Sequence, residues 1–377
     1  MTLLYDAVAA GMWAYTHAAF AVTTLGPRRF RLEPGTLLVS THRRETDVPV
    51  VCPPLYARAR LWRHRSPPER LSFAARADMF LPGFLAGFPP GLSPRVRRLL
   101  YPVAVGRRLA AMHVHPLRSA RVACLGEALA AEPERPLHQL VPAALLAELT
   151  VRAGACGLTP PGQARDVLRG EYADLLWRAV SPADVPAVSD RFWAGRAAEA
   201  ARDFRALVEL VRSGGVLLVF PEGKPSRDGE IGPIQRGLAA LVRRGEPSLL
   251  QPLALAYDPL TRGRTRVFVS IGDQVPAPRD DVEASVLALL HRTMPLTSGQ
   301  VVAHHLTAGA GRAPAELDRA AGAAVEAARG EGRNVEPDLL DAKRRRARLL
   351  EALAAAPGRP GDVAYLAREY RSARETA

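Results

Sequence analysis

The chain has 377 residues, of which 48% are apolar and 24% are charged, so it can form one large or two ordinary domains around a hydrophobic core. This composition excludes wholesale disorder. The net charge of +13 is uneven, because residues 1–121 carry 18 arginines and no lysine against six acidic residues, a net +12. Such an excess predicts an anionic partner. However, arginine supplies all but two of the 51 basic residues, so a coding bias would also explain it.

Nucleic acid is not an expected partner, since no recognised binding motif accompanies the charge and aromatic residues make up only 6% of the chain. The three cysteines, Cys52, Cys124 and Cys156, show neither paired nor metal-like spacing. They are typical of structural roles in a reducing compartment, and we expect neither a disulfide nor a zinc site.

The N-terminal segment contains no charged residue from Ala7 to Gly26. Its mean hydropathy is too low for a membrane span, and Asp6 replaces the basic residues that begin a signal peptide. The segment predicts a helix that either packs on the domain or lies at a bilayer surface with Trp13, Tyr15 and Phe20 at the interface.

Six short apolar runs, most of them separated by segments of helical pattern, predict buried strands. In chain order they are Thr36–Ser40, Leu71–Ala75, Ala111–Leu117, Val216–Phe220, Gln251–Tyr257 and Arg266–Ile271. The pattern predicts an α/β fold with a mixed, mostly parallel sheet flanked by helices.

Two regions have a helical pattern without strands. Residues 122–212 predict a helical insertion that ends in a helix over Ala197–Val211. Residues from about 281 onward predict further helices, at Asp281–Thr293, Pro314–Ala328 and Pro337–Ala355. We therefore expect an α/β domain over 1–280, interrupted by the insertion, and a helical C-terminal extension over 281–377.

The first chemical motif follows the strand Thr36–Ser40 and contains His42 and Asp47. An alcohol needs a base to become a nucleophile at neutral pH, and the ordinary pKa of histidine suits that role. Asp47 can orient the imidazole if His42 lies in the loop and Asp47 in the first turn of the next helix, where a carboxylate is also stabilised. By itself this spacing is more often a coincidence near a structural histidine.

The second motif, Phe220–Lys224, follows the strand Val216–Phe220. Backbone N–H groups beside Gly223, together with the cations of Lys224 and Arg227, could hold a phosphate. Glu222 would either contact a substrate hydroxyl or order the basic residues. An ordinary turn with solvated charges is the alternative.

Together the two motifs resemble the glycerolipid acyltransferases, the family typified by 1-acylglycerol-3-phosphate O-acyltransferase. The family's first motif is a histidine, four residues and an aspartate, which His42 and Asp47 match. Its third motif is the sequence from Phe220 to Gly223. Its second motif, a strand that ends in an arginine, fits residues 113–118, and its fourth, an apolar strand with a proline, fits residues 250–255. The resemblance covers roughly residues 30–275.

The chain departs from the family in two motif positions, and its insertion at residues 122–212 is also unusually long. Thr41 stands where the family usually has asparagine, and Lys224 with Pro225 precedes Ser226 and Arg227 where threonine, arginine and serine are usual. Either Lys224 or Arg227 could therefore take the place of the usual arginine.

The resemblance implies transfer of a fatty acyl group from acyl-CoA or acyl-carrier protein to a hydroxyl of a phosphorylated glycerolipid, in phospholipid biosynthesis. It implies His42 and Asp47 as catalytic residues and Arg118, Glu222, Gly223, Lys224 and Arg227 as substrate-binding residues, with no metal or bound cofactor. The expected acceptor is 1-acylglycerol-3-phosphate; another lysophospholipid, glycerol 3-phosphate or a glycolipid would use the same parts. The expected location is the cytoplasmic face of a membrane with an anionic surface, peripheral or monotopic.

Two other classes of function stay open. A lipid-binding protein that kept the fold without catalysis would also explain the basic charge. A hydrolase would need a nucleophile beside His42, and Ser40 is the nearest serine, without the glycine context of a nucleophile elbow.

Overall fold

The structure is a computed structural model that describes residues 2–28, 31–61, 70–87, 91–309 and 313–375. The chain divides into two compact units. The first unit consists of residues 1–71 and 209–377, and the second consists of residues 72–208. The first unit thus contains both the sheet strands that precede the predicted boundary at residue 280 and the helices that follow it.

The first unit is built on a mixed sheet with the strand order β1-β9-β8-β2-β7. β2 (Thr36–Ser40) lies between β7 (Val216–Val219) and β8 (Leu249–Asp258) and runs parallel to both. β9 (Arg266–Ile271) pairs antiparallel with β8 and parallel with β1 (Ala21–Leu25), while β10 (Val275–Pro276) pairs antiparallel with β8. The mixed, mostly parallel α/β sheet predicted from the sequence is confirmed.

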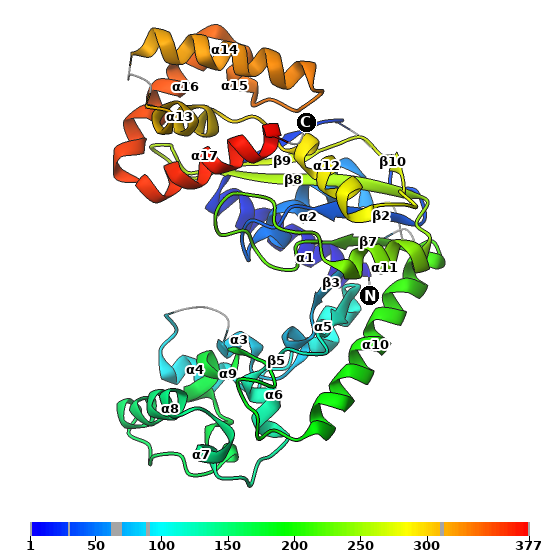
Figure 1. Cartoon of the computed structure of the whole chain (residues 1–377), viewed down its shortest axis with the longest axis vertical. Helices are drawn as coiled ribbons and strands as arrows, with labels where there is room; N and C mark the ends of the chain where they lie inside the picture. Colours follow the sequence, from blue (N-terminus) through cyan, green and yellow to red (C-terminus); the bar gives the residue numbers. More distant parts are fainter. Residues whose placement is uncertain (1, 29–30, 62–69, 88–90, 310–312, 376–377) are drawn as a thin grey trace. The chain divides into compact units, whose positions relative to one another are not determined.

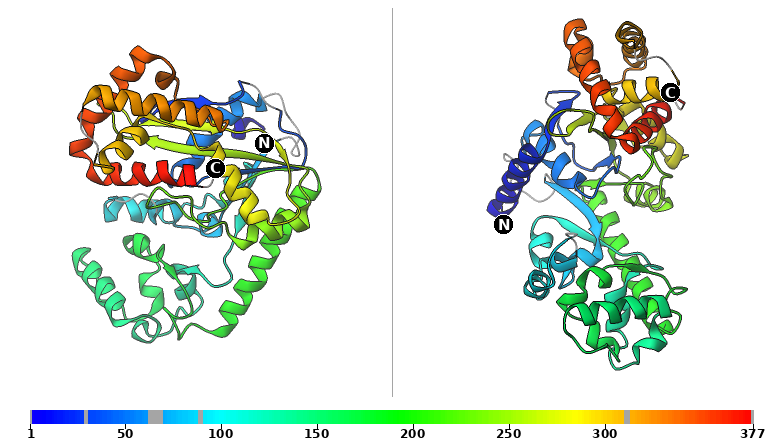
Figure 2. Two further views of the ribbon diagram at one scale, coloured as in Figure 1. Left: turned by 45° about the horizontal axis from the view of Figure 1, so that its top comes forward. Right: turned by 90° about the vertical axis from the view of Figure 1, so that its left-hand side faces the viewer.

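Helices cover both faces of this sheet, which explains why β2 and β7 are buried along their whole length. Figure 2 shows α1 (Thr2–Ala19) and α2 (Asp47–Arg58) on one side. It shows α12 (Val282–Thr293) and α17 (Pro360–Glu375) on the other. α11 (Arg236–Gly245) packs beside α12.

The C-terminal helices share one hydrophobic core (Figure 1). They are α13 (Ser298–Thr307), α14 (Pro314–Gly330), α15 (Pro337–Leu340), α16 (Ala342–Ala355) and α17. The predicted single helix over Pro337–Ala355 is two helices, because Asp341 is extended and its side chain caps α16 by accepting from the N–H of Arg344.

The second unit has two short strand pairs and a helical core. β3 (Leu71–Arg76), which begins at the last residue of the first unit, pairs parallel with β4 (Val114–Leu117), and β5 (Ala123–Cys124) pairs antiparallel with β6 (Ala179–Val180). Its α-helices are α3 (Phe84–Gly87), α4 (Pro94–Leu100), α5 (Gly106–Ala111), α6 (Leu125–Ala130), α7 (Leu137–Leu140), α8 (Ala143–Ala155), α9 (Ala173–Leu176) and most of α10 (Asp190–Arg212). The predicted helical insertion is confirmed as mainly helical, although it also contains β5 and β6.

The N-terminal helix packs on the protein. The Thr16 hydroxyl donates to the carbonyl of Pro49 in α2 at 2.6 Å, and the Phe20 ring meets the Tyr257 ring edge-on at 5.9 Å. Trp13 and Tyr15 remain about half exposed. Within the described residues, no helix has the length and apolar character needed to cross a bilayer.

Candidate active site

His42 and Asp47 lie where β2 gives way to α2. β2 ends at Ser40, His42 lies in the loop, and Asp47 is the first residue of α2, as the spacing predicts. The imidazole Nδ1 is 2.9 Å from Asp47 Oδ2. A carboxylate at this distance favours the tautomer with the proton on Nδ1, which leaves Nε2 as the basic nitrogen.

Asp47 is fully buried and its carboxylate is held from several directions. Oδ2 also accepts from the backbone N–H groups of Arg43 at 2.5 Å and Arg44 at 2.9 Å. Oδ1 accepts from the hydroxyl of Tyr257, in β8, at 2.7 Å. Burial, followed by the nearby Asp47, raises the pKa of Tyr257 above its ordinary value, so the phenol stays protonated and donates. These bonds fix the orientation of the carboxylate that orients His42.

Glu222 bridges the two motif loops. Its side chain is buried; Oε1 accepts from the N–H of His42 at 2.7 Å and Oε2 from the N–H of Gly232 at 2.8 Å. Burial raises the pKa of Glu222, opposed by the Arg43 guanidinium and by these two N–H groups. The structure thus shows a bridge that positions the His42 backbone, while contact with a substrate hydroxyl stays a prediction.

The loop after β7 closes against His42 at two further points. The Phe220 ring lies 4.5 Å from the His42 ring, centroid to centroid, at 30°. The N–H of Ser226 donates to the carbonyl of His42 at 2.8 Å. The sheet explains this meeting, because β2 and β7 are parallel neighbours and their carboxyl ends reach the same edge.

Gly223, Lys224 and Arg227 lie in that loop and are exposed. Gly223 adopts a left-handed conformation with φ of 72°, and a Cβ there would lie 3.2 Å from Cγ of Gln235. Neither cation has a hydrogen bond or ion pair among the residues that the structure describes. Both are therefore available to an anionic substrate.

Arg118 follows β4 in the second unit, as predicted, but it already has partners. Its Nη1 donates to both carboxylate oxygens of Asp203, at 2.9 and 2.8 Å, and its Nε lies 3.1 Å from Glu199. Both carboxylates belong to α10. Sequence reasoning missed this pairing, and contact of Arg118 with a phosphate stays a prediction.

Thr41, one of the departures from the family pattern, has a structural role. It is fully buried, and its hydroxyl accepts from the N–H of Leu255 at 2.9 Å while its own N–H donates to Leu253. These bonds fasten the end of β2 to β8 immediately before His42.

Arg43 links the His42 loop to the C-terminal helix. Its Nη1 donates to the carbonyls of Gly229 at 3.2 Å and Glu230 at 3.0 Å, and its Nε lies 3.5 Å from Glu369 in α17. Burial would lower the pKa of Arg43, but Glu369 and further anionic or polar groups raise it. In turn, Gln300 donates to the other oxygen of Glu369 at 2.7 Å. The sequence offered no signal for this connection.

Among the described residues, no three His, Cys, Asp or Glu side chains lie close enough together to hold a metal ion. The arrangement consists instead of an oriented imidazole, a buried carboxylate and a loop with two exposed cations. It can remove a proton from a hydroxyl and hold an anionic substrate beside it.

Comparison with known families agrees with this chemistry. Residues 184–256 match the family model described as Acyltransferase, the family of the glycerolipid acyltransferases, which confirms the resemblance predicted from the motifs. The match includes β7, the Phe220–Gly223 motif and most of β8, and it supports acyltransferase activity in general. His42 and Asp47 lie outside the matched residues, but the bond from the His42 N–H to Glu222 joins the two motifs. No curated protein matches the chain.

Proposed function

Starting from the acyltransferase match over residues 184–256, we propose that this protein transfers a fatty acyl group from an acyl thioester to a hydroxyl of a phosphorylated glycerolipid. The main support is the 2.9 Å contact between His42 Nδ1 and Asp47, beside the Glu222 loop. Asp47 is buried, and both of its carboxylate oxygens accept hydrogen bonds.

The reaction begins when Nε2 of His42 removes the proton from the acceptor hydroxyl. The oxygen attacks the thioester carbonyl, and Asp47 stabilises the imidazolium that forms. The tetrahedral intermediate then expels the thiolate, which takes the proton from Nε2 and leaves as a thiol. The new ester carries the acyl group, and His42 returns to its neutral form. No redox step and no covalent enzyme intermediate is required.

Substrate binding is assigned to the predicted residues. Lys224 or Arg227 holds the acceptor phosphate, and both are exposed on a loop that is hydrogen-bonded to His42 through Ser226. Glu222 and Gly223 keep this loop in place, and Arg118 contributes if a phosphate displaces one of its carboxylate partners. No metal or bound cofactor takes part.

The proposed acceptor is 1-acylglycerol-3-phosphate, and the proposed donor is acyl-CoA or acyl-carrier protein, which would place the protein in phospholipid biosynthesis. Other lysophospholipids, glycerol 3-phosphate and glycolipids are the alternative acceptors. Because such lipids reside in bilayers, we propose peripheral or monotopic association with an anionic membrane at its cytoplasmic face. The charge of residues 1–121 supports this association.

The test is an acyl-transfer assay with purified protein and a panel of acceptors. Thiol release and product formation should be greatest with 1-acylglycerol-3-phosphate, and His42→Ala should lower the rate by about a hundredfold or more. His138→Ala, at an exposed histidine, is the matched control and should retain full activity. Transfer to no acceptor, or full activity of His42→Ala, would contradict the proposal. Binding to anionic vesicles without turnover would instead favour a non-catalytic lipid-binding protein.

A further inference from the structure

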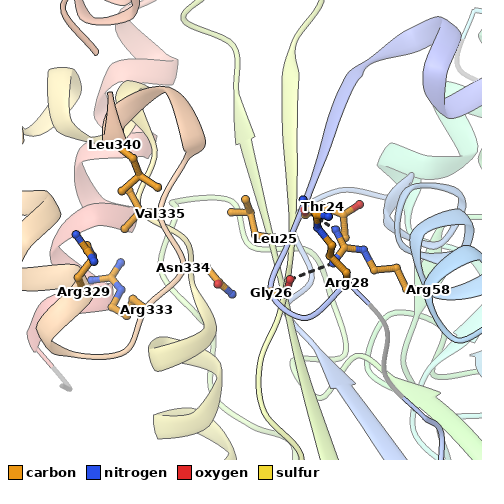
Figure 3. A pocket seen from close by; sticks show the side chains of 10 residues that line it. All are labelled: Thr24, Leu25, Gly26, Arg28, Arg58, Arg329, Arg333, Asn334, Val335 and Leu340. Carbon is orange, nitrogen blue, oxygen red and sulfur yellow. Dashed lines mark hydrogen bonds between the residues drawn. The ribbon is translucent and has the colours of Figure 1, made fainter. Parts of the chain in front are cut away.

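A cavity of about 360 Å³ lies in the first unit where β1 ends, and four of its lining residues are arginines. The lining consists of Thr24, Leu25, Gly26, Arg28, Arg58, Arg329, Arg333, Asn334, Val335 and Leu340. None of these residues is acidic. Figure 3 shows Arg28 and Arg58 on one side, Arg329 and Arg333 on the other, and Leu25 and Asn334 between them.

Arg333 is the most buried of the four, with 2% of its side chain exposed. Its Nε donates to the carbonyl of Met294 at 3.1 Å, and its Nη1 lies 3.4 Å from Glu331 and from the carbonyl of Ala373. Its Nη2 is buried and has no hydrogen-bond partner among the described residues. Burial lowers the pKa of Arg333, only partly opposed by Glu331. A guanidinium with an unsatisfied buried donor is energetically costly unless a ligand completes it.

Arg58, the last residue of α2, is fixed by neutral groups among the residues that the structure describes. Its guanidinium donates to the carbonyls of Gly26 at 3.0 Å, Pro27 at 2.5 Å and Thr24 at 2.8 Å. Burial, and then the nearby charge of Arg28, lower its pKa. Carbonyl partners orient this cation but do not neutralise it, so its charge remains available to the cavity.

Arg28 and Arg329 are exposed, and neither takes part in an ion pair or side-chain hydrogen bond among the described residues. Asn334 is held by its bonds to the Ser270 hydroxyl at 2.8 Å and the carbonyl of Ile271. The cavity thus combines two fixed guanidinium groups, of Arg58 and Arg333, with two exposed ones that can close on a ligand. This arrangement is typical of phosphate recognition, because each guanidinium can donate two hydrogen bonds.

The cavity is separate from the catalytic loop. α2 begins at Asp47 and ends at Arg58, so the two sites lie at opposite ends of a helix roughly 18 Å long. β8 and β9 also lie between β1 and β2, which places the latter two strands roughly 14 Å apart across the sheet.

We propose that this cavity is a second anion site that binds a phosphate-bearing ligand through Arg28, Arg58, Arg329 and Arg333. The phosphate can belong to a lipid headgroup or to a soluble phosphorylated molecule. The site does not depend on the acyl-transfer chemistry at His42.

The test uses inorganic pyrophosphate as the soluble probe in calorimetric titrations. Its lipid arm uses vesicles of phosphatidylcholine with and without phosphatidic acid in co-sedimentation. Arg28→Gln combined with Arg329→Gln removes two exposed cations without disturbing the fold. Arg319→Gln combined with Arg346→Gln removes the same charge from exposed positions on α14 and α16. A third variant, Lys224→Gln with Arg227→Gln, removes the cations of the catalytic loop.

We expect the Arg28/Arg329 variant to bind at least one probe about tenfold more weakly than the wild type, while the other two variants keep the binding attributed to the cavity. Loss with pyrophosphate identifies a soluble ligand, and loss with the phosphatidic acid vesicles alone identifies a headgroup. The proposal is overturned if neither probe binds, or if the Arg319/Arg346 variant weakens binding as much. The Lys224/Arg227 variant reports on the loop beside His42 alone. A failure of the proposed acyl-transfer site can therefore be told apart from a failure of the cavity site.

Discussion

Two buried arginines of the first unit, Arg43 and Arg333, both contact Met294, yet their surroundings differ. Arg43 donates to two carbonyls and faces the carboxylate of Glu369, and its pKa is raised despite burial. Arg333 pairs instead with Glu331, which is partly exposed, and its pKa is lowered; its Nη2, like Nε of Arg43, has no hydrogen-bond partner among the described residues. Both approach Met294, Arg43 through the sulfur and Arg333 through the carbonyl.

The two surroundings correspond to two uses of a buried cation. A guanidinium that protein carboxylates neutralise serves the structure, here by tying the His42 loop to α17. A guanidinium whose carboxylate partner is itself partly exposed keeps its capacity for an external anion. If this distinction holds, Arg43 is neutralised within the protein, whereas Arg333 can still bind an external anion.

The largest effect should come from Asp47→Asn, in the His42 loop region that Arg43 ties to α17. An amide cannot stabilise the imidazolium and can favour the wrong tautomer, so we expect kcat to fall about 10⁴-fold with a small change in KM. Steady-state thiol release measures this. Asp362→Asn, on exposed α17 surface, should retain wild-type kinetics. A loss of less than tenfold for Asp47→Asn would remove this carboxylate from the mechanism.

Glu369→Gln should have the next largest effect, on stability. It leaves Arg43 as an uncompensated buried charge, and breaking a buried pair in this way costs about 3–5 kcal/mol. The same Asp362→Asn variant breaks a half-exposed pair with Arg359, the residue just before this helix, and should cost about 0.5 kcal/mol or less. Urea unfolding compares the two. Equal losses would mean that Glu369 does not neutralise Arg43.

His291, in α12, feels the charges of both arginines, so its pKa reports their combined effect. Burial, then the charges of Arg43 and Arg333, lower its pKa to about 4, while a hydrogen bond with the Ser372 backbone opposes the shift. The unfolded chain binds this proton near pH 6.5, so the contribution of His291 to stability falls as the pH decreases from 6.5 towards 4. The loss should reach about 3 kcal/mol.

His291→Gln should therefore show a flatter pH profile of unfolding free energy between those values, measured by urea titrations at a series of pH values. Its stability at pH 8 sets the baseline for the substitution itself. Parallel profiles for the variant and the wild type would show that His291 titrates at its ordinary pKa.

Tyr257→Phe should have a smaller effect, because it removes only one of the hydrogen bonds to Asp47. The three nitrogen donors at Oδ2 remain, so kcat should fall about tenfold, equivalent to about 1–1.5 kcal/mol. Kinetic assays beside Asp47→Asn measure the difference. A loss as large as that of Asp47→Asn would make the phenol essential rather than supportive.

Local patterns sufficed for much of the fold and of the site. β2 and β9 have the predicted bounds because each is a compact apolar run between polar residues. The His42–Asp47 contact also follows from short-range spacing. β1 was not predicted, because the uncharged stretch from Ala7 to Gly26 shows no break at Phe20. The β-branched residues Val22, Thr23 and Thr24 were the signal that could have indicated a strand.

Long-range pairs could not be predicted in this way. Arg43 and Glu369 lie near opposite ends of the chain, and neither differs locally from the many other charged residues. Likewise, Tyr257 ended a predicted strand, but its bond to Asp47 depends on the order of β8 and β2 in the sheet. Only tertiary packing decides which cations are neutralised by carboxylates and which can still bind an external anion.

The smallest effect on stability should come from Arg333→Met, and it separates the two regions most sharply. Methionine can fill much of the same space, and the loss is limited to weak bonds with Met294 and Ala373 and to the ion pair with the partly exposed Glu331, so we expect a change of about 1 kcal/mol or less. Arg43→Met leaves Glu369 buried without its cation and should cost about 3–5 kcal/mol in the same urea titrations. If the two substitutions cost the same, neutralisation does not distinguish these arginines. If Arg333→Met alone is tolerated, Arg333 does not stabilise the fold. Its presence at a buried position then requires another reason. The proposed anion, which would accept from the Nη2 donor of Arg333 that lacks a partner among the described residues, supplies that reason.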